Sequence, residues 1–186
     1  KLQDRISSKS LHIMSSFAGT TGGVALSEAV KLGSLRDESK VAVVSIDFGT
    51  AYSGIAFALR ADPGSIKYGA PTAKDITQVK VPTILLELPG DEWRFGNDAE
   101  TRYNEILMAT PVGELPDAQL YRRFKMVLKD QETGFDTLEA TSTVGNSQNL
   151  MKLIAKSLEF LKDFALAQVQ YASHNGITDP ATNIQW

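Results

Sequence analysis

The 186-residue chain contains no cysteine, which excludes a disulfide framework, a thiolate nucleophile and a zinc–thiolate site. It also has no apolar run near the roughly 20 residues that a helix needs to cross a bilayer. The formal net charge is only −3, and no basic stripe or lysine–arginine cluster favours nucleic acid or an anionic membrane. We therefore expect neither nucleic acid nor a membrane as a partner. The missing cysteines fit a reducing compartment and are compatible with any other.

What the chain does have is ordinary globular composition, with 42% hydrophobic residues, enough for one domain or slightly more. Residues 1–40 mix basic residues and serines with acidic ones, and contain no apolar segment that ends in a small-residue cleavage site. This stretch favours a flexible leader over a targeting peptide, and we assign the folded domain to 41–186. Lys1 is not an initiator methionine, so we expect a processed chain or a fragment.

The first half of the domain has the patterns of strands. A β-branched apolar run ending in Asp47, a glycine-containing turn and a second apolar run predict a β-hairpin. Pro82 suits the start or the edge position of a later strand. The expected elements are strands over 41–47 and 54–59 joined by a turn over 48–53, a loop over 60–69, and strands over 81–88 and 93–96.

The second half has the spacing of helices. Asn97 or Asp98 is expected to cap the first helix, which Pro111 and Gly113 end. Three further segments follow. They are a helix capped by Asp117 that carries Leu120, Phe124, Val127 and Leu128, a polar loop over 133–147 with at most a short strand, and a long helix opened by Ser147 or Asn149 and stopped near His174. Residues 184–186 are typical of the start of another strand.

One segment, Ser45-Ile-Asp-Phe-Gly-Thr-Ala-Tyr-Ser-Gly, has the chemistry of a phosphate site. An acid at the end of a buried strand needs a partner, and hydrated Mg²⁺ is one that accepts a carboxylate. Gly49 lets backbone approach a ligand, Thr50 offers a hydroxyl, and turn amides can converge on an anion. The same pattern also occurs in plain hairpins, where Asp47 would only form the turn. The two common glycine-rich phosphate motifs, G-x-x-x-x-G-K-[ST] and strand–G-x-G-x-x-G, are absent.

Asp47-Phe-Gly-Thr-Ala-Tyr-Ser-Gly resembles the first phosphate motif of the actin-like ATPases, and in particular of the heat-shock-protein-70 family. Further elements follow in the family's order: Val81-Pro-Thr, Phe95-Gly-Asn-Asp-Ala, Arg123-Phe-Lys-Met, the long helix and Ile184-Gln-Trp. The phenylalanine after the acid and the Phe-Lys-Met element are most similar to the divergent branch called heat shock protein family A member twelve. The resemblance spans about 41–186.

The resemblance implies roles for individual residues. Asp47 would hold Mg²⁺ through water, and Gly49, Thr50, Ala51 and Tyr52 would form the loop around the β- and γ-phosphates of ATP. Lys125 would reach the γ-phosphate or the attacking water, because phosphoryl transfer needs neutralised oxygens and a nucleophile in line. Read without the resemblance, Lys125 is a solvated residue beside an apolar one. Typical relatives carry a second Thr or Ser where this chain has Ala51, which puts fast hydrolysis in doubt but leaves nucleotide binding intact.

The implied fold is α/β, of the ribonuclease-H-like, actin-like ATPase class, with the first strands of subdomain one and a helical insertion. The implied activity is ATP binding and hydrolysis to ADP, with Mg²⁺, by a cytoplasmic stress-response chaperone whose polypeptide clients bind a region absent here. The second phosphate loop would lie beyond Trp186, so we expect the isolated chain to bind ATP very weakly or not at all.

Two alternatives remain from the sequence. A non-catalytic nucleotide sensor or scaffold of the same fold is motivated by Ala51, and a sugar or acetate kinase of the superfamily would need an acceptor site that no motif indicates. His12 and His174 have no metal-ligand spacing. Trp93 and Phe95 are expected to pack in the core.

Overall fold

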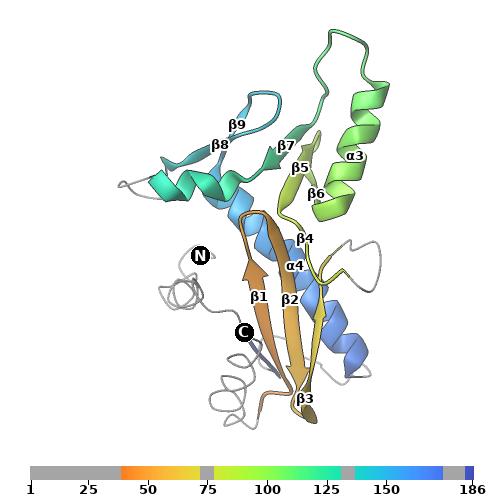
Figure 1. Cartoon of the computed structure of the whole chain (residues 1–186), viewed down its shortest axis with the longest axis vertical. Coiled ribbons are helices and arrows are strands. Elements are labelled where there is room, and N and C mark those ends of the chain that lie inside the picture. The colour runs from red at the N-terminus through yellow and green to blue at the C-terminus, as the bar shows by residue number, and fades with distance from the viewer. Residues whose placement is uncertain (1–38, 72–77, 131–136, 174–182) are drawn as a thin grey trace. The chain divides into compact units, whose positions relative to one another are not determined.

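The structure is a computed structural model, and it describes residues 39–71, 78–130, 137–173 and 183–186 (Figure 1). Nearly all of the predicted leader, together with His12 and His174, lies outside these residues. Residues Asp37–Trp186 form one compact unit. Within it the fold is mixed α/β, with three sheets, two α-helices and one 3₁₀ helix among the described residues.

The first sheet grows from the predicted hairpin. Strands β1 (Ala42–Phe48) and β2 (Tyr52–Leu59) pair antiparallel, which confirms the hairpin. The sheet runs in the order β10-β1-β2-β3, and the short β4 also pairs with β2. Strand β10 is parallel to β1, whereas the other pairs are antiparallel. The remaining members are β3 (Asp62–Gly69), β4 (Val81–Pro82) and β10 (Ile184–Gln185).

The second and third sheets are smaller. The second has the order β6-β5-β7 and is antiparallel throughout, and the third is a two-stranded hairpin. The predicted strand over 81–88 is thus divided at Thr83 between two sheets. Their strands are β5 (Ile84–Leu88), β6 (Glu92–Phe95) and β7 (Gln119–Arg122), and β8 (Glu139–Thr141) and β9 (Ser147–Asn149).

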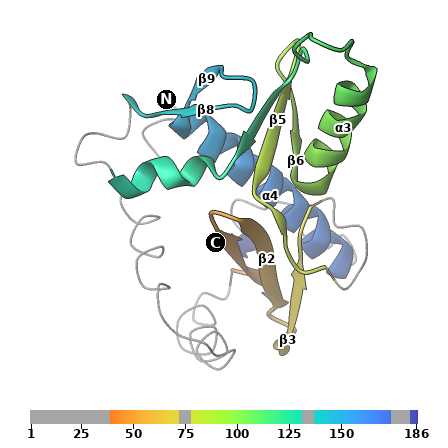
Figure 2. The ribbon, with the colours of Figure 1, turned by 45° about the horizontal axis from the view of Figure 1, so that its top comes forward.

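Helix α4 (Leu150–Ala172) lies behind β1 and β2 in Figure 1 and keeps to the same side in the turned view of Figure 2. Its buried residues recur every three or four positions, which places one continuous stripe against the sheet. The side chain of Asn149 accepts from the N–H of Lys152 (3.1 Å), so one of the two predicted caps is confirmed. The stripe consists of Leu150, Leu153, Ser157, Leu161, Ala165 and Val169.

Helix α3 (Gly96–Ala109) covers the second sheet, against which it buries Ala99 and Tyr103. Its N-cap is Phe95, whose side chain makes no capping hydrogen bond. The predicted caps, Asn97 and Asp98, instead lie inside the first turn. There the charge of Asp98 still favours the helix N-terminus.

Two of the elements predicted from the sequence were wrong. Residues 60–69, expected to be a loop, contain the edge strand β3, where Pro63 is tolerated because an edge strand need not donate on its outer side. The helix expected from Asp117 is instead β7, followed by the 3₁₀ helix η3 (Phe124–Asp130). Leu120 and Tyr121 are both buried on β7, on opposite faces. A strand covered on both faces loses the alternation that distinguishes it from a helix.

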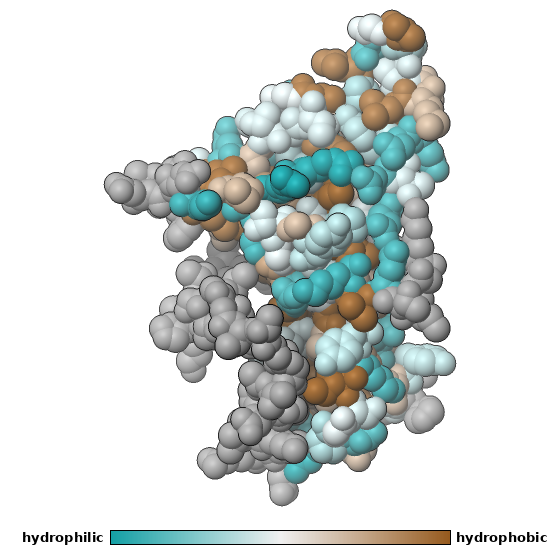
Figure 3. Space-filling view, in the orientation of Figure 1, coloured by the Kyte–Doolittle hydropathy of each residue, from teal (hydrophilic) through white to brown (hydrophobic). Residues whose placement is uncertain are grey.

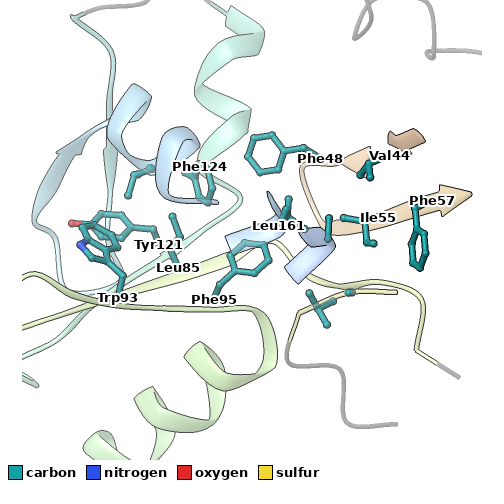
Figure 4. Packing of buried hydrophobic residues seen from close by; sticks show 14 of the residues in the cluster. Val44, Phe48, Ile55, Phe57, Leu85, Trp93, Phe95, Tyr121, Phe124 and Leu161 are labelled. Atoms are coloured by element: carbon teal, nitrogen blue, oxygen red, sulfur yellow. The ribbon is translucent and has the colours of Figure 1, made fainter. Parts of the chain in front are cut away.

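The main core joins the two larger sheets through α4. Figure 4 shows Phe48 at the end of β1 beside Phe124 at the start of η3, and the two ring centroids lie 6.4 Å apart. Trp93 and Phe95 are 8% and 0% exposed, which confirms that they pack in the core. Contacts across this core therefore fix where η3 lies relative to the end of β1.

On the face drawn in Figure 3, hydrophobic residues gather in several places, one of which is the far end of α3 and the loop after it. The gathering there contains Met108, Val112 and Leu115, all strongly exposed. Among the described residues no helix is both long and apolar enough to span a membrane.

Candidate functional site

The turn between β1 and β2 is tight and requires glycine. The N–H of Gly49 donates to the carbonyl of Tyr52 (3.1 Å), and this bond closes the turn. A Cβ placed on Gly49 would lie 2.4 Å from that same carbonyl oxygen, closer than real Cβ atoms approach backbone oxygen. Any larger residue at this position must therefore open the turn.

A pair of buried hydroxyl groups ties the turn to the start of β5. The hydroxyl of Thr83 donates to the carbonyl of Gly49 (2.9 Å) and lies 2.7 Å from the hydroxyl of Ser53. Each hydroxyl has one proton, so Ser53 must donate to Thr83 when Thr83 donates to Gly49. The N–H of Thr83 also donates to the carbonyl of Ala51 (2.8 Å). Both sides of the turn are thereby held by one threonine.

Two backbone amides of the turn have no acceptor among the described residues. In the described part of the chain, the N–H groups of Thr50 and Ala51 have no hydrogen-bond acceptor. Thr50 is half-buried, and Ala51 and Tyr52 are exposed. Adjacent amides without acceptors at an exposed turn are the backbone groups that an anion uses.

Asp47 lies on the exposed face of β1, because side chains alternate along a strand and Phe48 takes the buried position. The side chain of Asp47 is 57% exposed, so its carboxylate is not desolvated as the argument from the buried strand assumed. Its partner is Lys80, whose Nζ lies 2.5 Å from Oδ2. Gly54 faces Asp47 across the hairpin, and a Cβ there would lie 3.3 Å from Cγ of Lys80. The missing side chain leaves room for the lysine stem.

Lys125 comes to the same turn from 77 residues away. Its Nζ donates to the carbonyl of Phe48 and lies 4.2 Å from the centre of the Phe48 ring. Burial lowers the pKa of Lys125, and the charge of Asp47 acts in the opposite direction. Lys125 is thus not a freely solvated residue, which was the alternative interpretation from the sequence. Its contacts are with Phe48, directly before the turn over 49–52 that is the candidate phosphate loop.

The predicted site residues therefore meet in one place. Asp47, the turn over 49–52 and Lys125 surround the end of β1, although Asp47 is ion-paired instead of buried. No group of three His, Asp or Glu side chains suitable for a metal ion occurs in the part of the chain that the structure describes. A divalent ion here would depend on one carboxylate.

Sequence reasoning missed Ser53, Lys80 and Thr83. Thr83 stood within the quoted Val81-Pro-Thr element, so its position carried a signal but its hydrogen bonds did not. The sequence carried no signal for Lys80, because its distance from Asp47 depends on the pairing of β4 with β2.

A second polar cluster joins β5 and β7 to α4. The side chain of Glu87 is 20% exposed and accepts from the hydroxyl of Tyr121 (3.3 Å) and from Lys152 (3.4 Å). Gln148 donates to both carboxylate oxygens (3.2 Å each). Burial, with the charge of Glu87, raises the pKa of Tyr121 to about 12. All four side chains have partners within the cluster, so its role is to connect the elements.

No family model matches the chain. Over 138 residues it is 28% identical to "Heat shock 70 kDa protein 12B" of Homo sapiens, a match that covers 70% of this chain and 19% of that protein. The chain thus spans about a fifth of that relative's length. The mixed α/β fold is compatible with a fragment of an actin-like fold. The sequence similarity suggests a distant relationship to the heat-shock-70-like family.

Proposed function

We propose that the chain forms the first phosphate-binding part of a heat-shock-70-like nucleotide-binding domain that binds and hydrolyses ATP. The observation that carries the proposal is the convergence of Lys125 on the turn beside Asp47. An ammonium group, two turn amides without acceptors and an exposed carboxylate lie together at the end of β1. An ammonium group and backbone amides neutralise and orient a polyphosphate chain, and a carboxylate can hold the Mg²⁺ that accompanies it.

The strand order supports the finer fold assignment within this proposal. An antiparallel β1-β2-β3 meander is extended by β10, which is parallel to β1 and follows α4 in the chain. This arrangement is compatible with the first strands of a ribonuclease-H-like, actin-like ATPase domain. In that assignment, the second sheet and α3 are the insertion beside subdomain one.

Mg²⁺ and ATP fit the donors that are present. Mg²⁺ retains several waters and is commonly bound by one or two carboxylates together with substrate phosphates. Asp47 supplies one carboxylate, and its exposure leaves space for a water between it and the ion. Bound Mg²⁺ would neutralise charge on the phosphates. The chain's own residues would hold the phosphate chain through the turn amides and Lys125.

The test uses the natural full-length protein that contains this chain. Lys125→Met is expected to lower ATP turnover about 100-fold or more, as removal of one charge-stabilising donor does, while Mg-ATP affinity falls much less. Lys67→Met, an equal charge change on exposed strand β3, is the control. Turnover and affinity of Lys125→Met equal to those of the control would contradict the proposal.

A second candidate function is a nucleotide sensor or scaffold that binds ATP without rapid hydrolysis. Ala51 favours it, because its side chain is exposed at the turn and offers no hydroxyl to a phosphate. Steady-state hydrolysis by the full-length protein separates the two. A slow enzyme that Ala51→Thr accelerates supports the sensor, whereas little change in an already active enzyme contradicts it.

A further inference from the structure

The charges recorded around Asp47 are predominantly positive. Lys80 forms an ion pair with its carboxylate, and Lys125, in the 3₁₀ helix η3, interacts with it electrostatically. Two ammonium groups thus accompany one carboxylate, a net charge of +1. A free divalent cation approaching Asp47 must displace Lys80 and is repelled by both lysines. A phosphate anion is attracted by both.

The position of Lys80 is fixed by the fold. The lysine directly precedes Val81, which is fully buried and pairs with Ser53 in β2. Its stem lies over Gly54, the residue opposite Asp47, and its backbone neighbour Val79 also approaches Gly54 closely. The lysine is therefore held at the side of the turn where Asp47 projects.

The ion pair is not needed for stability. The side chains of Lys80 and Asp47 are 51% and 57% exposed, and exposed pairs of this kind contribute little to folding. The same exposure means that Lys80 can exchange the carboxylate for another anion at little cost. Substitution of Lys80 is accordingly a clean perturbation of charge.

We propose that Lys80 is a phosphate-binding residue and that, with Lys125, it makes the site accept a divalent cation only when phosphate accompanies it. This inference rests on the proposed function. When a polyphosphate binds, Lys80 moves from the carboxylate of Asp47 to a phosphate oxygen. Asp47 is then available to accept a hydrogen bond from water on the phosphate-bound ion. No covalent bond changes in this exchange.

The proposal predicts effects of opposite sign on two ligands. NMR titrations of the ¹⁵N-labelled full-length protein with inorganic triphosphate and, separately, with Mn²⁺ as a paramagnetic substitute for Mg²⁺ measure both. Lys80→Met is expected to weaken triphosphate binding about fivefold and to strengthen Mn²⁺ broadening at the amides of Asp47 and Phe48 about fivefold, the scale of one exposed charge pair. Lys67→Met, with the same change in net charge, is expected to cause neither local effect.

The outcomes separate this inference from the proposed function. Triphosphate shifts at residues 49–52 that depend on Lys125 but not on Lys80 would overturn the inference and leave the proposed function standing. Changes of equal sign for the two ligands, or a Lys80→Met variant that matches Lys67→Met, would also overturn it. Absence of any triphosphate shift at residues 49–52 in the unmodified full-length protein would overturn both.

Discussion

Replacing Thr83 with valine tests how the turn is held. Valine keeps the shape of threonine but removes the hydroxyl that donates to Gly49 and accepts from Ser53. Ser53 is 0% exposed, so its hydroxyl would lose its acceptor with no water in reach. An orphaned buried donor costs about 1–3 kcal/mol, and the lost bond to the half-buried Gly49 carbonyl adds about 1 kcal/mol. We therefore expect Thr83→Val to lower the free energy of unfolding by about 2–4 kcal/mol.

Urea denaturation of the chain measures this loss, and two further variants identify its cause. Ser53→Ala removes the orphaned donor, so the double variant with Thr83→Val is expected to lose about 1 kcal/mol less than the sum of the single losses. Thr83→Ser keeps the hydroxyl and is expected to cost only its methyl group, about 1 kcal/mol. A Thr83→Val loss under about 0.5 kcal/mol, or strict additivity, would refute the hydrogen-bond reasoning.

Three other predictions follow from the described contacts. Gly49→Ala is expected to destabilise the fold by about 1–3 kcal/mol through its clash with the Tyr52 carbonyl, whereas Gly64→Ala, with nothing within 4 Å, should be neutral or slightly stabilising in the same denaturation assay. Arg123 has a φ of +50°, so Arg123→Gly is expected to relieve about 1 kcal/mol of strain and raise the melting temperature; a lower melting temperature would contradict this. The pKa of Tyr121, about 12, lies above its ordinary value of 10.0, so the stability it contributes is complete below about pH 10 and is lost as pH rises through about 12. At about pH 11 the ¹³Cζ chemical shift of Tyr121 should still be that of the neutral phenol. Glu87→Gln should lower the pKa of Tyr121, and an unchanged titration would contradict the contribution of the Glu87 charge.

The hairpin was predictable because its signals are local. A β-branched run, a glycine turn and a second apolar run lie within 20 residues, and the tight turn does require Gly49. The long helix and its Asn149 cap were predictable for the same reason. Strand β7 was not, because its burial on both faces depends on a partner strand far away in the chain.

In the candidate site, too, the local features were predictable from the sequence and the contacts between distant residues were not. Asp47 and the turn are contiguous, so their chemistry could be read directly from the segment. The approach of Lys125 was expected only from a family resemblance, because no spacing rule connects residues 77 positions apart. Lys80 and Thr83 act through sheet pairing and buried hydrogen bonds, which one sequence does not display.

A crystal structure of the full-length protein with Mg²⁺ and a non-hydrolysable ATP analogue tests the proposed phosphate site most directly. Phosphate oxygens are expected within hydrogen-bond distance of the N–H groups of Thr50 and Ala51 and of the Nζ of Lys125. Asp47 is expected to contact the magnesium through water. An analogue bound elsewhere, with the Asp47–Lys80 pair intact and the N–H groups of Thr50 and Ala51 still without acceptors, would contradict the proposal.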